Sequence, residues 1–232
     1  MTAASNAFIF GAGAQGRTVL DMLRAAACYD HLAFVDDRSD LIGCSINGAE
    51  VFGNLVDLAE TCEGADKNVG LVVALGRPQL RELVAGRIAE MIEKWPDRLS
   101  FINALHPQAY IAASARLGLG NMIAAQSVVN SNACLGNHII VNTAAVIEHD
   151  DQIDDYASIC PGAQLGGRVT VGKAAFIGTG AVILPRVKIG EGAVVGAGSL
   201  VTRDVPAHTL VYGAPARVIR PIDKDFDFGR LL

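Results

Sequence analysis

The tripeptide Glu148-His149-Asp150 places an imidazole between two carboxylates, a combination that can move protons near neutral pH. A neutral imidazole can accept a proton from an attacking amine or hydroxyl, and a neighbouring carboxylate orients the ring and stabilises its charged form. Acyl transfer from a thioester needs a base of this kind. His138 is a competing candidate, whereas His106, which precedes a proline, is expected to be structural but could approach a substrate cleft.

A second chemical signal lies near the start of the chain, where an apolar segment is followed by Gly11, Gly13 and Gly16 in the spacing G-x-G-x-x-G. Amides at the N-terminus of the following helix favour a phosphate, and an acidic residue after the second strand, Asp36 or Asp37, favours ribose or sugar hydroxyls. Taken alone, this motif indicates a dinucleotide and hydride transfer. It predicts a nucleotide site whose chemistry depends on the rest of the chain.

Composition narrows the function classes. The 232 residues carry a formal net charge of -5, and 51% of them are hydrophobic, which is ample for a buried core. No run of Lys or Arg favours nucleic acid, and no apolar run approaches the ~18 residues that a membrane helix needs. We therefore expect a cytoplasmic globular protein without nucleic-acid or membrane partners. Reduced thiols without metal-ligand spacing are expected at the five cysteines, Cys28, Cys44, Cys62, Cys134 and Cys160.

A six-residue period identifies the elements that must position the histidine. Such a period fits neither an α-helix nor a hairpin meander, but it fits a parallel β-helix in which three short strands form each coil. The aliphatic residue points inward, the small residue two positions earlier fits the corner, and the glycine that often follows is expected to ease the turn. His149 then lies in a turn. The period is carried by Ile111, Leu117, Ile123, Val129, Leu135, Val141, Ile147, Ile153, Ile159, Leu165, Val171, Ile177, Ile183, Ile189, Val195 and Val201.

The first hundred residues show the patterns of α/β units. Strands are expected at 8–10, 32–35 and 69–75, and helices at 15–27 and 78–93. Because ligands bind outside the carboxyl ends of parallel strands, the loops 11–16, 36–38 and 76–77 should converge. About 100 residues leave no room for the substrate domain of a usual dehydrogenase. We assign residues 1–104 to a nucleotide-binding domain and residues 105–232 to the β-helix with a C-terminal extension.

The repeat and the closing segment 204–220 resemble the left-handed β-helix acyltransferases that carry hexapeptide repeats. A Rossmann-like domain ahead of the helix narrows the resemblance to the nucleotide-sugar N-acetyltransferases and sialic-acid O-acetyltransferases, whose motif NTxxxIEH plus an acid reads NTAAVIEHD at 142–150. The resemblance implies an α/β domain followed by an all-β, left-handed parallel β-helix. It also implies a homotrimer with active sites between subunits, His149 as the base and Asp150 as its support. Glu148 follows an inward position and is expected to face outward.

Binding residues follow from the same resemblance. Many members of the group have His where Gln15 stands, which leaves the identity of the nucleotide open. Acetyl-CoA is implied as co-substrate, and no metal is expected. The resemblance implies acetyl-CoA contacts at Ser158, Gly167, Thr179 and Ala197, and nucleotide-sugar contacts at Gly13, Ala14, Gln15, Asp36, Asp37 and Gly76.

We therefore predict an acetyl-CoA-dependent N-acetyltransferase that acts on a nucleotide-linked amino sugar, at a 4-amino group. O-acetylation of a sugar hydroxyl, including that of sialic acid, is the alternative within the same fold. An NAD-dependent oxidoreductase, a zinc hydratase of the gamma carbonic anhydrase kind and a non-catalytic nucleotide-sugar sensor are alternatives from other classes. The histidines lack the spacing of that zinc family. The nucleotide, the sugar and the pathway stay open.

Overall fold

The computed structural model describes residues 6–64, 69–223 and 226, and the side chains of 62–64 are outside this description. The chain forms two compact units, Met1–Gly76 with Leu80–Pro107, and Arg77–Gln79 with Gln108–Leu232. Within the described ranges, no helix is both long and apolar enough to cross a membrane. Cys28, Cys44, Cys134 and Cys160 are free thiols, as expected, whereas the side chain of Cys62 is not described.

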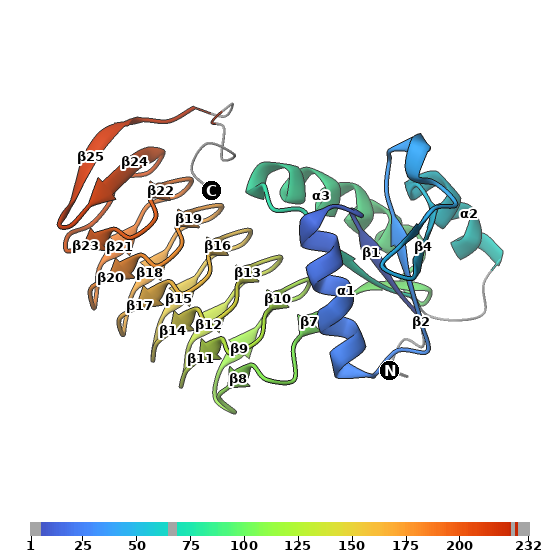
Figure 1. The fold of residues 1–232 in the computed structure, drawn as a ribbon, viewed down its shortest axis with the longest axis horizontal. Coiled ribbons are helices and arrows are strands. Elements are labelled where there is room, and N and C mark those ends of the chain that lie inside the picture. The colour runs from blue at the N-terminus through green and yellow to red at the C-terminus, as the bar shows by residue number, and fades with distance from the viewer. Residues whose placement is uncertain (1–5, 65–68, 224–225, 227–232) are drawn as a thin grey trace. The chain divides into compact units, whose positions relative to one another are not determined.

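The first unit contains a six-stranded sheet in the order β3-β4-β2-β1-β5-β6. The three central strands are parallel, so their carboxyl ends lie at one edge. All the strands and helices expected here are present, and the antiparallel β3–β4 pair, the helix α2 and the strand β6 are additional elements that were not expected. The elements, shown in Figure 1, are β1 Asn6–Phe10, α1 Ala14–Ala26, β2 His31–Val35, the 3-10 helix Ser39–Leu41, β3 Ser45–Ile46, β4 Ala49–Gly53, α2 Leu55–Gly64, β5 Val69–Val73, α3 Pro78–Lys94, β6 Leu99–Phe101 and β7 Ala104–Leu105.

Apolar burial explains why this sheet forms around β1 and β5. Every residue of β5 is buried, as expected for a parallel strand that is covered on both faces. Helix α1 buries Val19, Leu20 and Leu23 on one face and exposes its charged residues. These elements hold the three loops at the carboxyl edge of the sheet.

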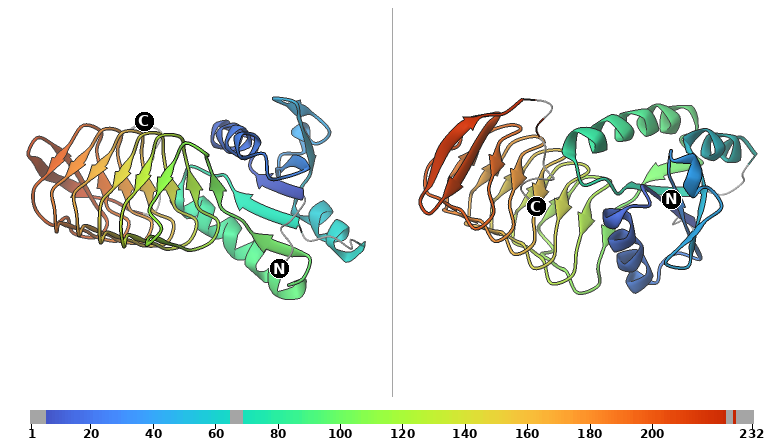
Figure 2. Two further views of the ribbon diagram at one scale, coloured as in Figure 1. Left: turned by 90° about the horizontal axis from the view of Figure 1, so that it is seen from below. Right: turned by 45° about the horizontal axis from the view of Figure 1, so that its top comes forward.

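The second unit is a parallel β-helix, and its strands follow the predicted register. From Tyr110 to Val201, each strand ends on one of the sixteen aliphatic residues, and strands eighteen residues apart pair in parallel, as those of Val129, Ile147 and Leu165 do. The stacked coils are visible in Figure 2. Only Ile111 and Leu117, in the first coil, are less than fully buried among these residues. The predicted fold class, a Rossmann-like domain followed by a β-helix, is confirmed.

Three sheets form the sides of the β-helix. The first contains β10 Met122–Ile123, β13 Ile140–Val141, β16 Ser158–Ile159, β19 Phe176–Ile177, β22 Val194–Val195, β24 Thr209–Gly213 and β25 Ala216–Pro221. The second contains β8 Tyr110–Ile111, β11 Val128–Val129, β14 Val146–Ile147, β17 Gln164–Leu165, β20 Val182–Ile183 and β23 Leu200–Val201. The third contains β9 Arg116–Leu117, β12 Cys134–Leu135, β15 Gln152–Ile153, β18 Thr170–Val171 and β21 Lys188–Ile189.

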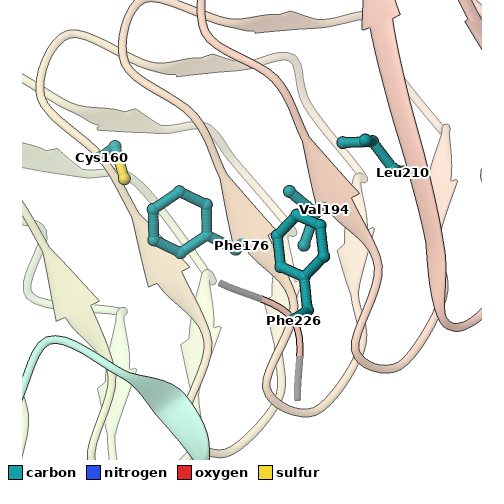
Figure 3. Close-up of a cluster of buried hydrophobic side chains, with 5 residues drawn as sticks. All are labelled: Cys160, Phe176, Val194, Leu210 and Phe226. Carbon is teal, nitrogen blue, oxygen red and sulfur yellow. The ribbon is translucent and has the colours of Figure 1, made fainter. Parts of the chain in front are cut away.

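The outward side chains of the three sheets differ. Those of the first sheet are buried from β10 to β22, and Phe226 packs against Phe176 and Val194 on its surface (Figure 3). The third sheet presents polar residues in most strands. The second sheet presents exposed or half-exposed apolar side chains, including Tyr110 at 59% and Val182 at 39% exposure. An apolar sheet face that is open to solvent favours association with another surface.

The glycines that follow the inward aliphatic residues were expected to ease the turns, but the strained backbone conformation lies at another position of each hexad. Every sixth residue from Gly120 to Gly198 has a positive φ. Each of these residues lies three positions before an inward aliphatic residue, and Asp150, with φ 62°, is one of them. The glycines that directly follow an aliphatic residue have another reason. A Cβ at Gly178 would lie 2.6 Å from the backbone nitrogen of Ala197 in the next coil, so close approach between coils excludes a side chain there.

Candidate active site

His149 lies in the turn between β14 and β15, at the corner of the second and third sheets. Its Nδ1 is 2.9 Å from Asp150 Oδ2, and its side chain is 53% exposed. Because an ionised carboxylate can only accept a hydrogen bond, the Nδ1–H of the neutral ring donates to Asp150. The other ring nitrogen, Nε2, then carries the lone pair that a base needs.

Asp150 is oriented by residues from two neighbouring coils. Asn132 Nδ2 donates to Asp150 Oδ1 at 3.4 Å, and Arg168 Nε is 3.6 Å from Oδ2. The hydrogen bond with His149 lowers the pKa of Asp150, and Asn132 and the positive charge of Arg168 lower it further. Asp150 is therefore ionised at neutral pH and can stabilise the imidazolium that forms when His149 accepts a proton.

Glu148 was expected to face outward, but it is half-buried and stabilises the turn. Its Oε2 accepts hydrogen bonds from the backbone N–H of His149 at 3.2 Å and from Asn130 Nδ2 at 3.1 Å. The carboxylate therefore binds the backbone of His149. Asp150 is the residue that contacts the ring.

The sequence interpretation missed Asp151, whose side chain is fully buried directly beside this turn. Burial raises the pKa of Asp151 to about 7, against hydrogen bonds from the amides of Val169 and Glu148 that lower it. The negative charge of Glu148 adds to the increase, and His149 opposes it. A sequence signal was available, because the hexads have Ala, Ser or another uncharged residue at the position that Asp151 occupies.

The predicted acetyl-CoA residues lie in three places on the β-helix. Gly167 lies against the base, since a Cβ there would be 2.5 Å from His149 Nε2. Thr179 and Ala197 are exposed in successive coils, at the corner between the first and second sheets. Ser158 is buried on β16 of the first sheet. Within one chain, only Gly167 of these four is brought to His149.

The competing histidine, His138, is in a different environment. It is 4% exposed, lies at the corner between the third and first sheets, and stacks on Tyr156 with ring centroids 5.3 Å apart. His106 belongs to the first unit. Among the described residues, no cluster of three or more His, Cys, Asp or Glu side chains could hold a metal ion.

A pocket of about 400 Å³ lies at the carboxyl edge of the sheet in the first unit. It is lined from the ends of β1, β2 and β5, the three loops that were expected to converge. Arg81, which is fully buried in α3, donates from Nη1 to the carbonyl oxygen of Leu75 at 2.6 Å and so fixes the third loop. The lining includes all six predicted nucleotide-sugar residues, Gly13, Ala14, Gln15, Asp36, Asp37 and Gly76.

Each glycine of the G-x-G-x-x-G motif contributes to this pocket in a different way. Gly11 has φ 100°, a conformation that side chains disfavour. A Cβ at Gly16 would meet the carbonyl oxygen of Gly11, so the first turn of α1 packs tightly against the loop. At Gly13, the residue that precedes α1, nothing lies within 4 Å of the position that a Cβ would occupy, which leaves open space at the N-terminus of the helix. A phosphate could occupy such a position.

Asp36 contacts its own chain at both carboxylate oxygens. Its Oδ2 accepts the N–H of Ala12 at 2.8 Å, and Arg38 donates from Nε to Oδ1 and from Nη2 to Oδ2, each at 2.9 Å. Burial by itself would raise the pKa of Asp36, but these hydrogen bonds outweigh it and hold the pKa below its usual value. Asp36 therefore fixes the loop and Arg38. Asp37 is the more exposed carboxylate, at 48%, and lies 3.2 Å from Arg87 Nη1.

Two family models match the chain. Residues 6–88 match the PglD N-terminal domain, and residues 168–203 match the bacterial transferase hexapeptide, six repeats. A curated relative, the GDP-perosamine N-acetyltransferase of Escherichia coli O157:H7, is 32% identical over 168 residues, which cover 70% of this chain and 71% of the relative.

Solved structures are similar over almost the whole chain. The acetyltransferase domain of PglB from Neisseria gonorrhoeae, in complex with acetyl coenzyme A, has a TM-score of 0.85 at 30% identity, covering 94% of this chain and 100% of that one. PerB from Caulobacter crescentus, in complex with CoA and GDP-perosamine, has a TM-score of 0.83 at 32% identity, covering 93% and 97%. The matches extend over both units.

Proposed function

We propose, since this chain belongs to the hexapeptide-repeat sugar N-acetyltransferases, that it transfers the acetyl group of acetyl-CoA to the amino group of a nucleotide-linked amino sugar. A 4-amino group is the expected acceptor. Relatives that are 32% identical carry the names GDP-perosamine N-acetyltransferase and PerB, the latter in complex with GDP-perosamine, so a GDP-linked amino sugar is the first substrate to test.

The observation that carries this proposal is the His149–Asp150 pair at 2.9 Å. In the proposed reaction, Nε2 of His149 removes a proton from the acceptor amine while the amine nitrogen attacks the thioester carbonyl carbon. The new C–N bond forms, the C–S bond breaks, and the imidazolium returns its proton to the departing sulfur, so that CoA leaves as the thiol. Asp150 stabilises the imidazolium while it exists, and backbone amides at the turns of the β-helix are expected to stabilise the oxyanion.

Gly167 supports the assignment of Nε2 as the reacting atom. The missing side chain at this position leaves Nε2 uncovered, because a Cβ would stand 2.5 Å from it. A thioester and an amine can approach the ring only from such an open side. We therefore retain Gly167 as an acetyl-CoA contact, together with Ser158, Thr179 and Ala197.

The pocket of the first unit is proposed to hold the nucleotide part of the acceptor. Its lining combines the N-terminus of α1 with Asp37 and the Asp36–Arg38 pair. Helix amides favour a diphosphate, and an exposed carboxylate can accept hydrogen bonds from hydroxyl groups. Gln15 lines the same pocket, at the position where many relatives of this group have His.

We further propose that the active unit is a homotrimer with active sites between subunits. Exposed apolar residues on the second sheet, Tyr110 and Val182 among them, support association. His149 lies at a corner of this sheet. The predicted acetyl-CoA residues Thr179 and Ala197 lie at its other corner, so one chain alone does not gather the site around His149.

The test is a thiol-release assay with acetyl-CoA and a panel of GDP-, UDP- and dTDP-linked amino sugars, with free sialic acid as an O-acetyl acceptor. We expect release to depend on a nucleotide-linked amino sugar. His149→Ala should lower kcat by about 10² to 10⁴, the usual contribution of a general base. Substitution of the buried histidine, His138→Gln, is the matched control and should retain kcat.

Four results would contradict parts of the proposal. Thiol release that no amino sugar stimulates would refute the reaction, and tight NAD(H) binding without acetyl-CoA binding would favour the oxidoreductase class instead. A His149→Ala variant with the full rate would refute the assignment of the base. Release stimulated by sialic acid alone would replace N-acetylation by O-acetylation.

A further inference from the structure

Asp151 interrupts the repeat at one corner of the β-helix. It stands two residues before the inward Ile153, where Ala133, Ala145 and Ala157 stand in neighbouring hexads. Like these alanines, it has no exposed surface. An acidic side chain in a buried position that fits a methyl group requires hydrogen bonds from its surroundings, because burial of an unpaired charge is costly.

Two backbone amides supply these hydrogen bonds. The N–H of Glu148 donates to Asp151 Oδ2 at 3.0 Å, and the N–H of Val169, in the next coil, donates to Oδ1 at 2.7 Å. Asn130 is the equivalent of Glu148 in the preceding coil, and its N–H donates to the carbonyl oxygen of Ile147 in the next coil, at 2.9 Å. The Asp151 carboxylate therefore replaces regular backbone hydrogen bonds at this corner.

The two amides belong to the two turns that hold the base. Glu148 begins the turn that carries His149 and Asp150. Val169 ends the turn that carries Gly167, which lies under Nε2 of His149, and Arg168, whose Nε is 3.6 Å from Asp150. The carboxylate thus joins the turn of the base to the turn that shapes its surroundings.

We infer that Asp151 is a positioning residue for the acetyl transfer, because its buried carboxylate fixes the turn of His149 to the adjoining turn at Gly167 and Arg168. This inference rests on the proposed function, in which His149 is the base. In this role Asp151 acts through the amides of Glu148 and Val169 and not by direct contact with the imidazole ring or the substrate. Its effect is on geometry, and a displacement of a reacting group by about 1 Å can cost on the order of 10² in rate.

The charge of Asp151 should matter as well as its shape. The titratable and charged groups near it are Glu148, His149 and Asp150 on its own turn. The adjoining turn contributes Arg168, which is 3.6 Å from Asp150, and the preceding coil contributes uncharged Asn130 and Asn132. Protonation of the carboxyl near pH 7 would remove one acceptor from the two amides. These two hydrogen bonds should therefore weaken as the pH falls below about 7, while protonation relieves the burial of the charge and so stabilises the fold as a whole.

Steady-state kinetics with acetyl-CoA and the accepted amino sugar test this role. Asp151→Ala restores the residue of the neighbouring hexads, and we expect kcat to fall by about 10- to 100-fold with KM changed by less than about twofold. Asn121→Ala is the matched control. Asn121 is also fully buried two residues before an inward aliphatic, and its Oδ1 accepts the N–H of Ile139 at 2.8 Å, but its coil does not carry the base.

The kinetic outcomes are decisive in both directions. A selective loss of kcat in Asp151→Ala, with Asn121→Ala near the wild-type rate, supports the inference. A kcat within twofold of wild type, or an equal loss in both variants, overturns it. If Asp151→Ala does not fold, Asp151→Asn preserves the size of the side chain and should lose about tenfold, because an amide offers only one acceptor oxygen.

A second measurement does not depend on activity. In amide-resolved NMR of the intact protein, the N–H signals of Glu148 and Val169 should shift together with a midpoint near pH 7 and should lose this shift in Asp151→Asn. Signals that do not respond to pH, or that respond equally in the variant, refute the inference that Asp151 joins the two turns. If the wild type transfers acetyl to no amino sugar, the proposed function fails, and this measurement still decides whether Asp151 holds the two turns.

Discussion

Replacing Asp151 by Asn should remove a pH dependence of folding stability that the buried carboxyl imposes. The pKa of Asp151 rises from 3.8 to about 7 because the side chain is buried. Between these values the folded protein keeps a proton that the unfolded chain releases, so stability is highest below about pH 4 and falls as the pH rises toward 7. A shift of about 3 pKa units corresponds to about 4 kcal/mol at 1.36 kcal/mol per unit.

Most of this change in folding stability lies in a pH range in which unfolding can be measured. Between pH 4.5 and 8, the linkage relation assigns about 3 kcal/mol of the decrease to Asp151. Asn carries no proton, so the free energy of unfolding of Asp151→Asn should lack this decrease. In the difference between the two proteins, the contributions of all other titrating groups cancel if their environments are unchanged.

The assay is equilibrium urea unfolding of both proteins at several pH values and at one protein concentration, since association makes stability depend on concentration. Asp154→Asn, which removes an exposed carboxylate three residues away, is the control and should follow the wild type. The wild-type stability should fall relative to Asp151→Asn by about 3 kcal/mol as the pH rises to 8. A difference that stays constant within about 0.5 kcal/mol would refute the reasoning, because it would mean that Asp151 titrates alike in both states.

Three further predictions concern the other parts of the site. Gly167→Ala should lower kcat at least about tenfold while the melting temperature remains near wild type, because a Cβ would displace the exposed imidazole of His149; an unchanged kcat contradicts this. Asp36→Asn should raise the KM for the nucleotide sugar about tenfold in steady-state kinetics, since charge-assisted hydrogen bonds of about 1.5–3 kcal/mol hold its loop, and an unaltered KM argues against it. Val182→Arg should shift the protein toward monomers in light scattering and lower activity in parallel; a fully active trimer excludes the second sheet as the interface.

Much of the fold could be predicted because its signals are local. A residue that must point inward recurs every six positions, and each coil repeats the same demand on shape and polarity, so the strands end where the sequence predicts. The glycine motif and the apolar segments around it similarly identify β1, α1 and β5. The antiparallel β3–β4 pair and the helix α2 were missed; β3 has only two residues, which leave almost no pattern.

The candidate site was only partly predictable, and the residue roles taken from the resemblance stay predictions. The resemblance named Gly167, which lies beside His149, and the six nucleotide-sugar residues, which line one pocket. It did not indicate that Asp36 turns both oxygens to its own chain, or that Asp151 is buried with two amides. These arrangements depend on the directions in which side chains point.

The sequence by itself determined the architecture, the position of His149 in a turn and the family that this chain resembles. Only the tertiary structure decided which groups surround the base. Asn132, Asp150 and Arg168 lie eighteen residues apart in the chain and meet because successive coils stack in register. Burial then sets the charge of Asp151, and burial is a property of the packed coils, which no short segment encodes alone.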